Sequence, residues 1–229
     1  MCTKAVSVNV RAMAEKLGVP VVTPVSGFKG GAGSPEEKMN ILPTDLAPVI
    51  THQRPREIQY MRWGLVPHFI DQKEVKPMLN ARAETLTKLA SFRDLIMVSR
   101  CLILNAGFFE TEKTSEEQIQ HQISPAQEDY FYKAGLWTTA RDQNTGAIIE
   151  SFTMITCDPA GHDFRRLHDR MPIIMNKAER RLWMNPNATL AQLLALLKPC
   201  HEEMYRVTEY SRKPVKAKRE KKDDKDFLF

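Results

Sequence analysis

The sequence predicts a single α+β domain in which a curled, mostly antiparallel β-sheet, a pseudo-barrel, carries peripheral helices. Apolar, β-prone runs crowd the middle of the chain, whereas helical patterns lie at its margins and near its end. Strands and helices therefore do not alternate as they do in α/β folds. The 229 residues are enough to bury a full core, and no internal repeat divides them. We assign residues 1–211 to this one domain.

The first third of the chain contains short elements. Residues 10–17 form a helical pattern that Gly18 ends. Residues 23–35 are rich in glycine, serine and proline, which is typical of a loop. Residues 46–50 and 58–63 have the composition of strands, with a polar segment between them.

Strand patterns dominate the centre, and two helical patterns follow. The expected elements are, in order, a helical segment at 84–89, a buried strand at 96–106, a polar excursion at a hairpin tip at 114–128, strands at 130–137 and 151–157, and helices at 177–184 and 189–197.

The composition is that of a soluble globular protein, with a formal net charge of +5. Part of this excess lies in residues 212–229, a polar and self-repelling segment that we expect to be a disordered basic tail. A solvated end is the simpler interpretation of this tail, and a non-specific tether to nucleic acid is the alternative. The chain shows neither a secretory signal nor an apolar run of membrane-spanning length, so we expect a cytoplasmic protein that does not contact membranes.

The four cysteines are scattered along the chain and form no Cys-x-x-Cys pair. This pattern disfavours a zinc site, and we expect neither a metal nor a cofactor. Cys101 and Cys157 lie in apolar runs and are most simply core residues.

Cys2 differs because it follows the initiator methionine directly. Removal of Met1 would leave a free α-amine and a thiol on one residue, and both groups are partly nucleophilic near neutral pH. An aldehyde condenses with such an amine to an imine, and the thiol then closes a five-membered thiazolidine. Read alone, however, Cys2 is an ordinary terminal residue.

Four further segments change this interpretation. They are residues 61–67 (MRWGLVP), 79–84 (LNARAE), 106–110 (AGFFE) and 167–172 (LHDRMP). Together with Met1-Cys2, and in this order, they resemble the SRAP family (SOS-response-associated peptidase), over Cys2 to about Trp183. The resemblance implies a protein that shields abasic sites in single-stranded DNA by covalent crosslinking.

The resemblance assigns four catalytic residues, which are Cys2, Asn80, Glu110 and His168. It makes Cys2 the nucleophile that methionine removal exposes. The Asn80 amide suits holding an opened sugar, and the Glu110 carboxyl suits moving protons during imine formation. A donor at His168 favours the open-chain aldehyde. Outside this context, Asn80 reads as a turn residue, Glu110 as a strand-end charge and His168 as a structural histidine.

DNA contacts are expected from a second set of residues. Arginines offer planar donors to phosphate oxygens, and aromatic or proline side chains offer wedges or stacking faces beside the lesion, although such aromatics are more often core. This set comprises Lys4, Trp63, Pro67, Arg82, Phe92 and Arg170. The resemblance adds Asn40 and Pro43, which match a loop of the form N-x-x-P near the site of the family.

The sequence departs from the family pattern at several positions. Thr3 and Lys4 follow Cys2 where glycine and arginine are usual, Ala106 replaces an aspartate, and Thr111 replaces a tryptophan. Residues 23–35 have no family counterpart. These departures affect the expected DNA contacts more than the four catalytic residues.

Three other functions remain open at this stage. The protein is alternatively a thiol-type peptidase that removes its own Met1, a non-covalent single-stranded DNA-binding module, or a lyase that cuts the strand after imine formation. In each DNA-directed case the partner is single-stranded DNA, which would associate the protein with the nucleoid. The sequence does not address the oligomeric state.

Overall fold

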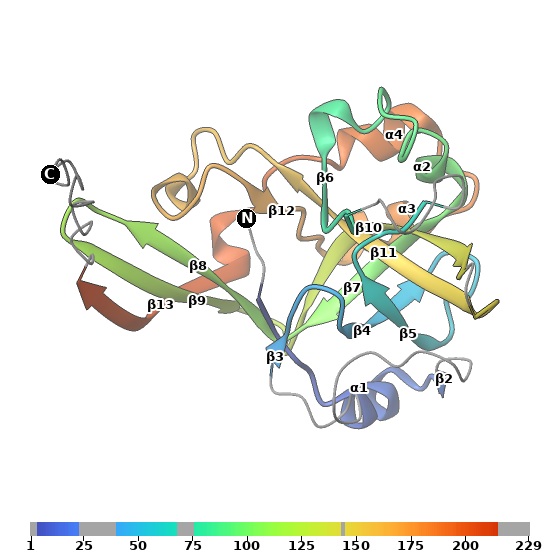
Figure 1. The fold of residues 1–229 in the computed structure, drawn as a ribbon, viewed down its shortest axis with the longest axis horizontal. Helices are drawn as coiled ribbons and strands as arrows, with labels where there is room; N and C mark the ends of the chain where they lie inside the picture. Colours follow the sequence, from blue (N-terminus) through green and yellow to red (C-terminus); the bar gives the residue numbers. More distant parts are fainter. Residues whose placement is uncertain (1–3, 23–39, 68–75, 143–144, 215–229) are drawn as a thin grey trace, which may run out of the picture.

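The computed structural model describes residues 4–22, 40–67, 76–142 and 145–214. They form one α+β domain in which a barrel continues into an arm of long strands (Figure 1). This confirms the predicted fold class. The barrel strands are β4 (Leu46–Thr51), β5 (Ile58–Trp63), β7 (Arg100–Asn105), β10 (Phe131–Arg141) and β11 (Ile148–Cys157).

The barrel closes through a parallel pair. Its strands follow the antiparallel order β11-β10-β7-β4-β5, and Phe152 of β11 then pairs with Trp63 of β5. The next residue, Gly64, donates its N–H to the Phe152 carbonyl at 2.8 Å. Its φ of 123° favours glycine, and a Cβ there would lie 2.6 Å from the Pro77 side chain.

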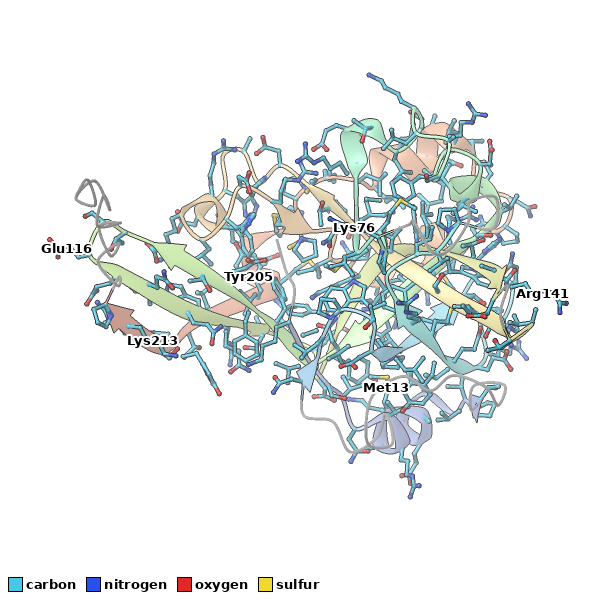
Figure 2. All side chains as sticks on the ribbon, in the orientation of Figure 1. Met13, Lys76, Glu116, Arg141, Tyr205 and Lys213 are labelled. Atoms are coloured by element: carbon cyan, nitrogen blue, oxygen red, sulfur yellow. The ribbon has the colours of Figure 1, made fainter. Side chains whose placement is uncertain are left out.

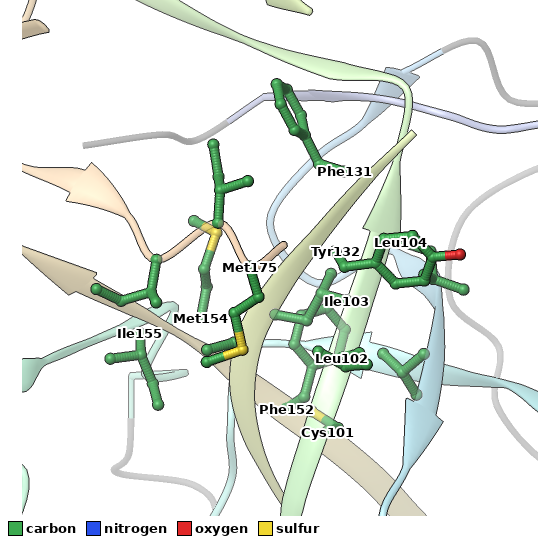
Figure 3. Close-up of a cluster of buried hydrophobic side chains, with 14 of the residues drawn as sticks. Cys101, Leu102, Ile103, Leu104, Phe131, Tyr132, Phe152, Met154, Ile155 and Met175 are labelled. Carbon is green, nitrogen blue, oxygen red and sulfur yellow. The ribbon is translucent and has the colours of Figure 1, made fainter. Parts of the chain in front are cut away.

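Alternating side chains fill the barrel with apolar groups. Ile103 of β7 and Phe152 and Met154 of β11 lie inside the barrel (Figure 3). The short strands β2 (Val21–Val22), β6 (Asn80–Arg82) and β12 (Met171–Pro172) extend this sheet.

A second sheet of five strands, in the order β13-β9-β8-β1-β3, forms the arm. Its strands are β1 (Ala5–Val6), β3 (Asn40–Ile41), β8 (Gly107–Lys113), β9 (Glu117–Pro125) and β13 (Tyr205–Pro214). Glu116 and Lys213 lie toward its free end, far from Arg141 (Figure 2). The arm meets the barrel where β7 leads into β8.

Helices occupy the margins of the barrel. They are α1 (Val10–Leu17), α2 (Leu95–Val98), α3 (Lys177–Trp183) and α4 (Leu190–Ala195), with 3-10 turns η1 (Ala83–Thr85), η2 (Asp163–Arg166) and η3 (Glu202–Met204). The Asn9 side chain caps α1 and Gly18 ends it in a left-handed conformation. Capping boxes begin α3 and α4. No helix in the described ranges is long and apolar enough to cross a bilayer.

The structure corrects several sequence-based predictions. The strand predicted at 96–106 begins only at Arg100, because Leu95–Val98 form α2. The helical pattern at 84–89 contributes only to the single turn η1 and the turns after it. Most of the excursion predicted at 114–128 is strand β9.

The C-terminal boundary also differs from the prediction. Strand β13 continues through Arg212 to Pro214, three residues into the expected tail, because its backbone pairs with β9 and Arg212 bonds to Glu209. Residues 215–229 and the loop predicted at 23–35 lie outside the described residues.

Candidate active site

Glu110 lies on β8 at the junction of arm and barrel. Its strand pairs with β1 on one side and β9 on the other, and its side chain is only 4% exposed. Burial raises the pKa of Glu110 from an ordinary 4.5 to about 7, a rise that the charge of Asp169 supports and that of Lys133 opposes. A carboxyl group with this pKa both takes and gives protons near neutral pH.

The N-terminal strand is fixed beside this carboxyl group. The N–H of Phe109 donates to the Lys4 carbonyl oxygen at 3.1 Å, and Ala5 pairs with Phe108. The described chain therefore begins next to Glu110. Cys2, the predicted nucleophile, lies outside the described residues.

His168 lies in the loop between η2 and β12. Its Nδ1 is 2.9 Å from the Arg170 N–H and 2.6 Å from an Asp169 carboxylate oxygen. These contacts require different protonation states, because a neutral Nδ1 accepts from Arg170 whereas only a protonated Nδ1 donates to Asp169. Burial lowers the pKa of His168, so we assign the neutral form. The proton is then on Nε2, which acts as a donor.

The loop that carries His168 packs on β8. The Phe164 ring lies 6.1 Å from that of Phe108, and an Arg166 guanidinium nitrogen lies 3.5 Å from the Glu112 carboxylate. The structure therefore brings His168 and Glu110 to the same region.

Asn80 is the first residue of β6 and pairs with Met154 of β11. Its side chain is half-buried, and within the described part of the chain no hydrogen-bond partner reaches its buried Oδ1. Two residues on, Arg82 pairs with Thr156, which also pairs with Pro172 of β12. Asn80 is thus tied through β11 to the segment that follows His168.

Arg170 forms hydrogen bonds within the protein. Its two terminal nitrogens bind the Glu84 carboxylate at 2.9 and 2.8 Å, and one also donates to the Thr156 carbonyl at 2.6 Å. The hydrogen bonds from Arg170 lower the pKa of Glu84. Arg170 therefore holds η1 against the His168 loop, and both of its terminal nitrogens donate within the protein.

The other expected DNA contacts fall into two groups. Trp63, Phe92 and Pro67 are buried, and the Trp63 indole donates to the Leu79 carbonyl at 3.1 Å. Pro67 also lines a surface pocket of about 260 Å³. The partly or fully exposed residues are Lys4, Asn40, Pro43 and Arg82.

Lys4 lies on the other face of the arm from Glu110. Its Nζ is 4.4 Å from the centre of the Phe109 ring and 5.9 Å from that of Tyr210. Phe109 and Glu110 are adjacent on one strand, so their side chains point to opposite faces. A phosphate bound by Lys4 would therefore lie across the sheet from the carboxyl group.

Sequence reasoning missed two buried polar side chains near Glu110. His121 is its cross-strand partner on β9, with Nε2 2.8 Å from the Glu112 carboxylate. Lys133, on β10, is fully buried. The alternating pattern at 119–123 and a lone lysine within the apolar strand at 130–137 were the signals available.

The whole described domain, barrel and arm together, falls within one protein family. The SRAP family profile (SOS response associated peptidase) matches residues 1–215, and the chain belongs to this family. No group of three or more potential metal ligands occurs in the described ranges.

The similar proteins include curated relatives and a solved structure. The chain is 31% identical to abasic site processing protein YoaM of Bacillus subtilis, over 72% of this chain and 73% of that protein. It is 30% identical to abasic site processing protein HMCES of Xenopus tropicalis, over 57% of this chain and 45% of that protein. A crystal structure of a protein from Bacteroides thetaiotaomicron matches with a TM-score of 0.78 and 28% identity, covering 92% of each chain.

Proposed function

We propose that this protein captures abasic sites in single-stranded DNA covalently, through a thiazolidine formed by Cys2. The observation that carries the proposal is the buried Glu110, with a pKa near 7, beside the fixed backbone of Lys4. Two peptide units separate Cys2 from Lys4, so their Cα atoms lie within about 7 Å of each other. The names of the relatives, abasic site processing proteins, support the same substrate.

The proposed chemistry has three steps, which are peptide hydrolysis, imine formation and ring closure. Hydrolysis of the Met1–Cys2 peptide bond frees the α-amine of Cys2. The amine adds to the sugar aldehyde, and Glu110 passes two protons in turn from the nitrogen to the aldehyde oxygen. The first forms the hydroxyl and the second lets it depart as water, which leaves the imine. The thiol then adds across the imine, with sulfur bonding to carbon and the thiol proton passing to nitrogen.

His168 and Asn80 act on the sugar in this proposal. The Nε2–H of His168 donates to the ring oxygen and favours the open-chain aldehyde that reacts. The buried Oδ1 of Asn80 accepts a hydrogen bond from a substrate hydroxyl or from the Cys2 amine. The proposed place of action is cytosolic, nucleoid-associated DNA, which Arg82 contacts through phosphate.

The test is a denaturant-stable adduct with an abasic single-stranded oligonucleotide, followed by intact-mass spectrometry. Cys2→Ala abolishes the adduct, and Glu110→Gln slows its formation by about 10²-fold or more. Glu116→Gln is the control, because Glu116 is exposed and lies toward the free end of the arm (Figure 2). A Cys2→Ala variant that crosslinks as well as the wild type would refute the proposal.

Removal of Met1 by the protein itself is a second candidate activity. Glu110 favours it, because a buried base lies where the N-terminal strand begins. Glu110→Ala should then retain Met1 when no methionine aminopeptidase is present. Met1 loss in that variant would assign the step to another enzyme. Strand scission on a denaturing gel would instead identify a lyase, and equal binding of intact and abasic DNA a non-covalent binder.

A further inference from the structure

Lys133 places a positive charge inside the junction of barrel and arm. The side chain is completely buried on β10 and lines the barrel interior beside Ala5 of β1 and Asn105 of β7. Its Nζ is 3.8 Å from the centre of the Phe108 ring and 5.5 Å from that of Phe131. The ammonium lies over both rings, and cation–π attraction to them favours its charged form.

A buried ammonium also needs a negative charge nearby, because burial of a charge without compensation is very costly. Phe108 and Glu110 are two residues apart on β8, so their side chains lie on the same face. The ammonium that rests on Phe108 therefore lies on the same side of β8 as the Glu110 carboxyl group. Its charge opposes the effect of burial on the pKa of Glu110.

We propose that Lys133 is a positioning residue that favours the ionised form of Glu110, so that Glu110 can take the proton of the Cys2 amine. This inference rests on the proposed function of Glu110 and deepens it. Lys133 does not touch the substrate in this account, because it has no exposed surface. It acts through the carboxyl group alone.

Other charged groups face Glu110 from the elements around it. Asp169, in the loop after η2, acts in the opposite sense to Lys133. His168 precedes it in the same loop, while His121 of β9 is held by the Glu112 carboxylate. Among the described residues, Lys133 is the cation with the largest lowering effect on the pKa of Glu110.

The experiment measures the pH dependence of adduct formation under single-turnover conditions in the wild type and in Lys133→Met. Loss of the ammonium moves the acid limb of the profile upward by about one pH unit or more. The rate then falls by about tenfold below the midpoint and recovers toward the wild-type rate in alkaline solution. Asn105→Leu is the matched control, since it changes an uncharged residue of the same interior and leaves the midpoint in place.

An unchanged midpoint of the pH profile in Lys133→Met would overturn the inference. An equal loss of rate at every pH would overturn it too, because that result would indicate a purely structural role. Lys133→Gln is the second neutral variant if Lys133→Met does not fold. In the wild type, the ¹⁵Nζ signal of Lys133 must be that of an ammonium throughout the range in which Glu110 titrates. A neutral amine at pH 7 would also refute the inference.

A ¹³C titration of the Glu110 carboxyl group separates this inference from the proposed function. The signal is assigned by its absence in Glu110→Gln, and its midpoint is compared between wild type and Lys133→Met. A wild type that forms no adduct refutes the proposed function, whereas the titration still decides whether Lys133 controls the ionisation of Glu110. An equal midpoint in the two proteins refutes the inference alone.

Discussion

A carboxyl group that titrates near neutral pH in a folded protein affects stability as well as chemistry. Burial raises the pKa of Glu110 to about 7, so the folded protein holds a proton that the unfolded chain releases near its ordinary value of 4.5. The stabilisation from this proton is fully present below pH 4.5. It is lost as the pH rises toward 7, because unfolding is then coupled to ionisation.

Glu110→Gln removes this dependence. We expect the stability of the variant relative to the wild type to increase between pH 4.5 and pH 7, by about 1–3 kcal/mol in total. Urea unfolding at a series of pH values measures the difference. A difference that stays constant across this range would show that Glu110 is not the group whose proton is retained.

Two arginines that the sequence places together as DNA contacts should behave differently. Arg82 is exposed, whereas the Arg170 side chain is only 11% exposed and binds Glu84 and Thr156. Arg82→Met should weaken single-stranded DNA binding and reduce its salt dependence by about one ion, with little change in stability. Arg170→Met should destabilise the fold by about 2 kcal/mol.

Fluorescence anisotropy at several salt concentrations and thermal unfolding together check this pair. Each variant serves as the control for the other. Equal losses of stability in the two would contradict the structural role of Arg170.

The residue types of the site were visible in the sequence, but their surroundings were not. Motifs single out Asn80, Glu110 and His168, and the loop packing brings the last two to one region. His121 is a neighbour of Glu110 only through the register of the β8–β9 pair, and Lys133 approaches it only because its side chain packs on Phe108. Trp63 and Phe92 show the converse, because the sequence around these aromatic residues does not reveal that both side chains are buried.

At the scale of elements, the corrections share a physical cause. Strand β9 alternates buried Ile123 and His121 with polar residues, so its average composition resembles that of a loop. Strand β13 is stabilised by the edge that β9 offers rather than by its own apolar content. Local composition cannot reveal a pairing partner more than eighty residues away in the chain.

The break between α2 and β7 depends on one buried side chain. The Arg100 guanidinium donates to the carbonyl oxygens of Ile96 and Met97 at 2.8 Å, of Trp183 at 2.7 Å and of Asn185 at 2.9 Å. These carbonyls lie at the ends of α2 and α3, where helical partners are lacking. The Arg100 side chain thus links α2 and α3 to the barrel strand β7.

Arg100→Met leaves these four carbonyl groups without their donor. We expect a loss of at least about 3 kcal/mol, or roughly 6–12 °C in Tm for a chain of this size. Differential scanning calorimetry measures it. Arg93→Met is the control, because that side chain is 57% exposed and should change stability by less than about 0.5 kcal/mol. Similar Tm values for both variants would contradict the role of Arg100.

At the scale of the whole molecule, the described fold ends with β13 at Pro214. A chain that stops there should keep the Tm of the full protein to within about 1 °C, because it retains every described element. Its affinity for single-stranded DNA should also stay within about twofold, if residues 215–229 aid solubility only. A marked drop in affinity that disappears at high salt would instead identify the tail as an electrostatic tether.

The closure of the barrel shows the limit of sequence reasoning at this scale. The density of strands in the middle of the chain predicts a curled sheet. The parallel contact between β11 and β5 closes it, and that contact joins residues almost ninety positions apart. Sequence periodicity identifies which face of a strand is buried, but it carries no information about such a partner.

Strand β11 has a consequence for how this site can change. Along one edge, its end pairs with β12, which follows His168, and along the other it pairs with β6, which begins at Asn80. A displacement of that one strand end would carry the amide and the imidazole in the same direction. Substitutions that move the end of β11 should therefore shift the Asn80 amide and the His168 imidazole together. To move only one of these side chains, a substitution must lie in the segment that carries that residue.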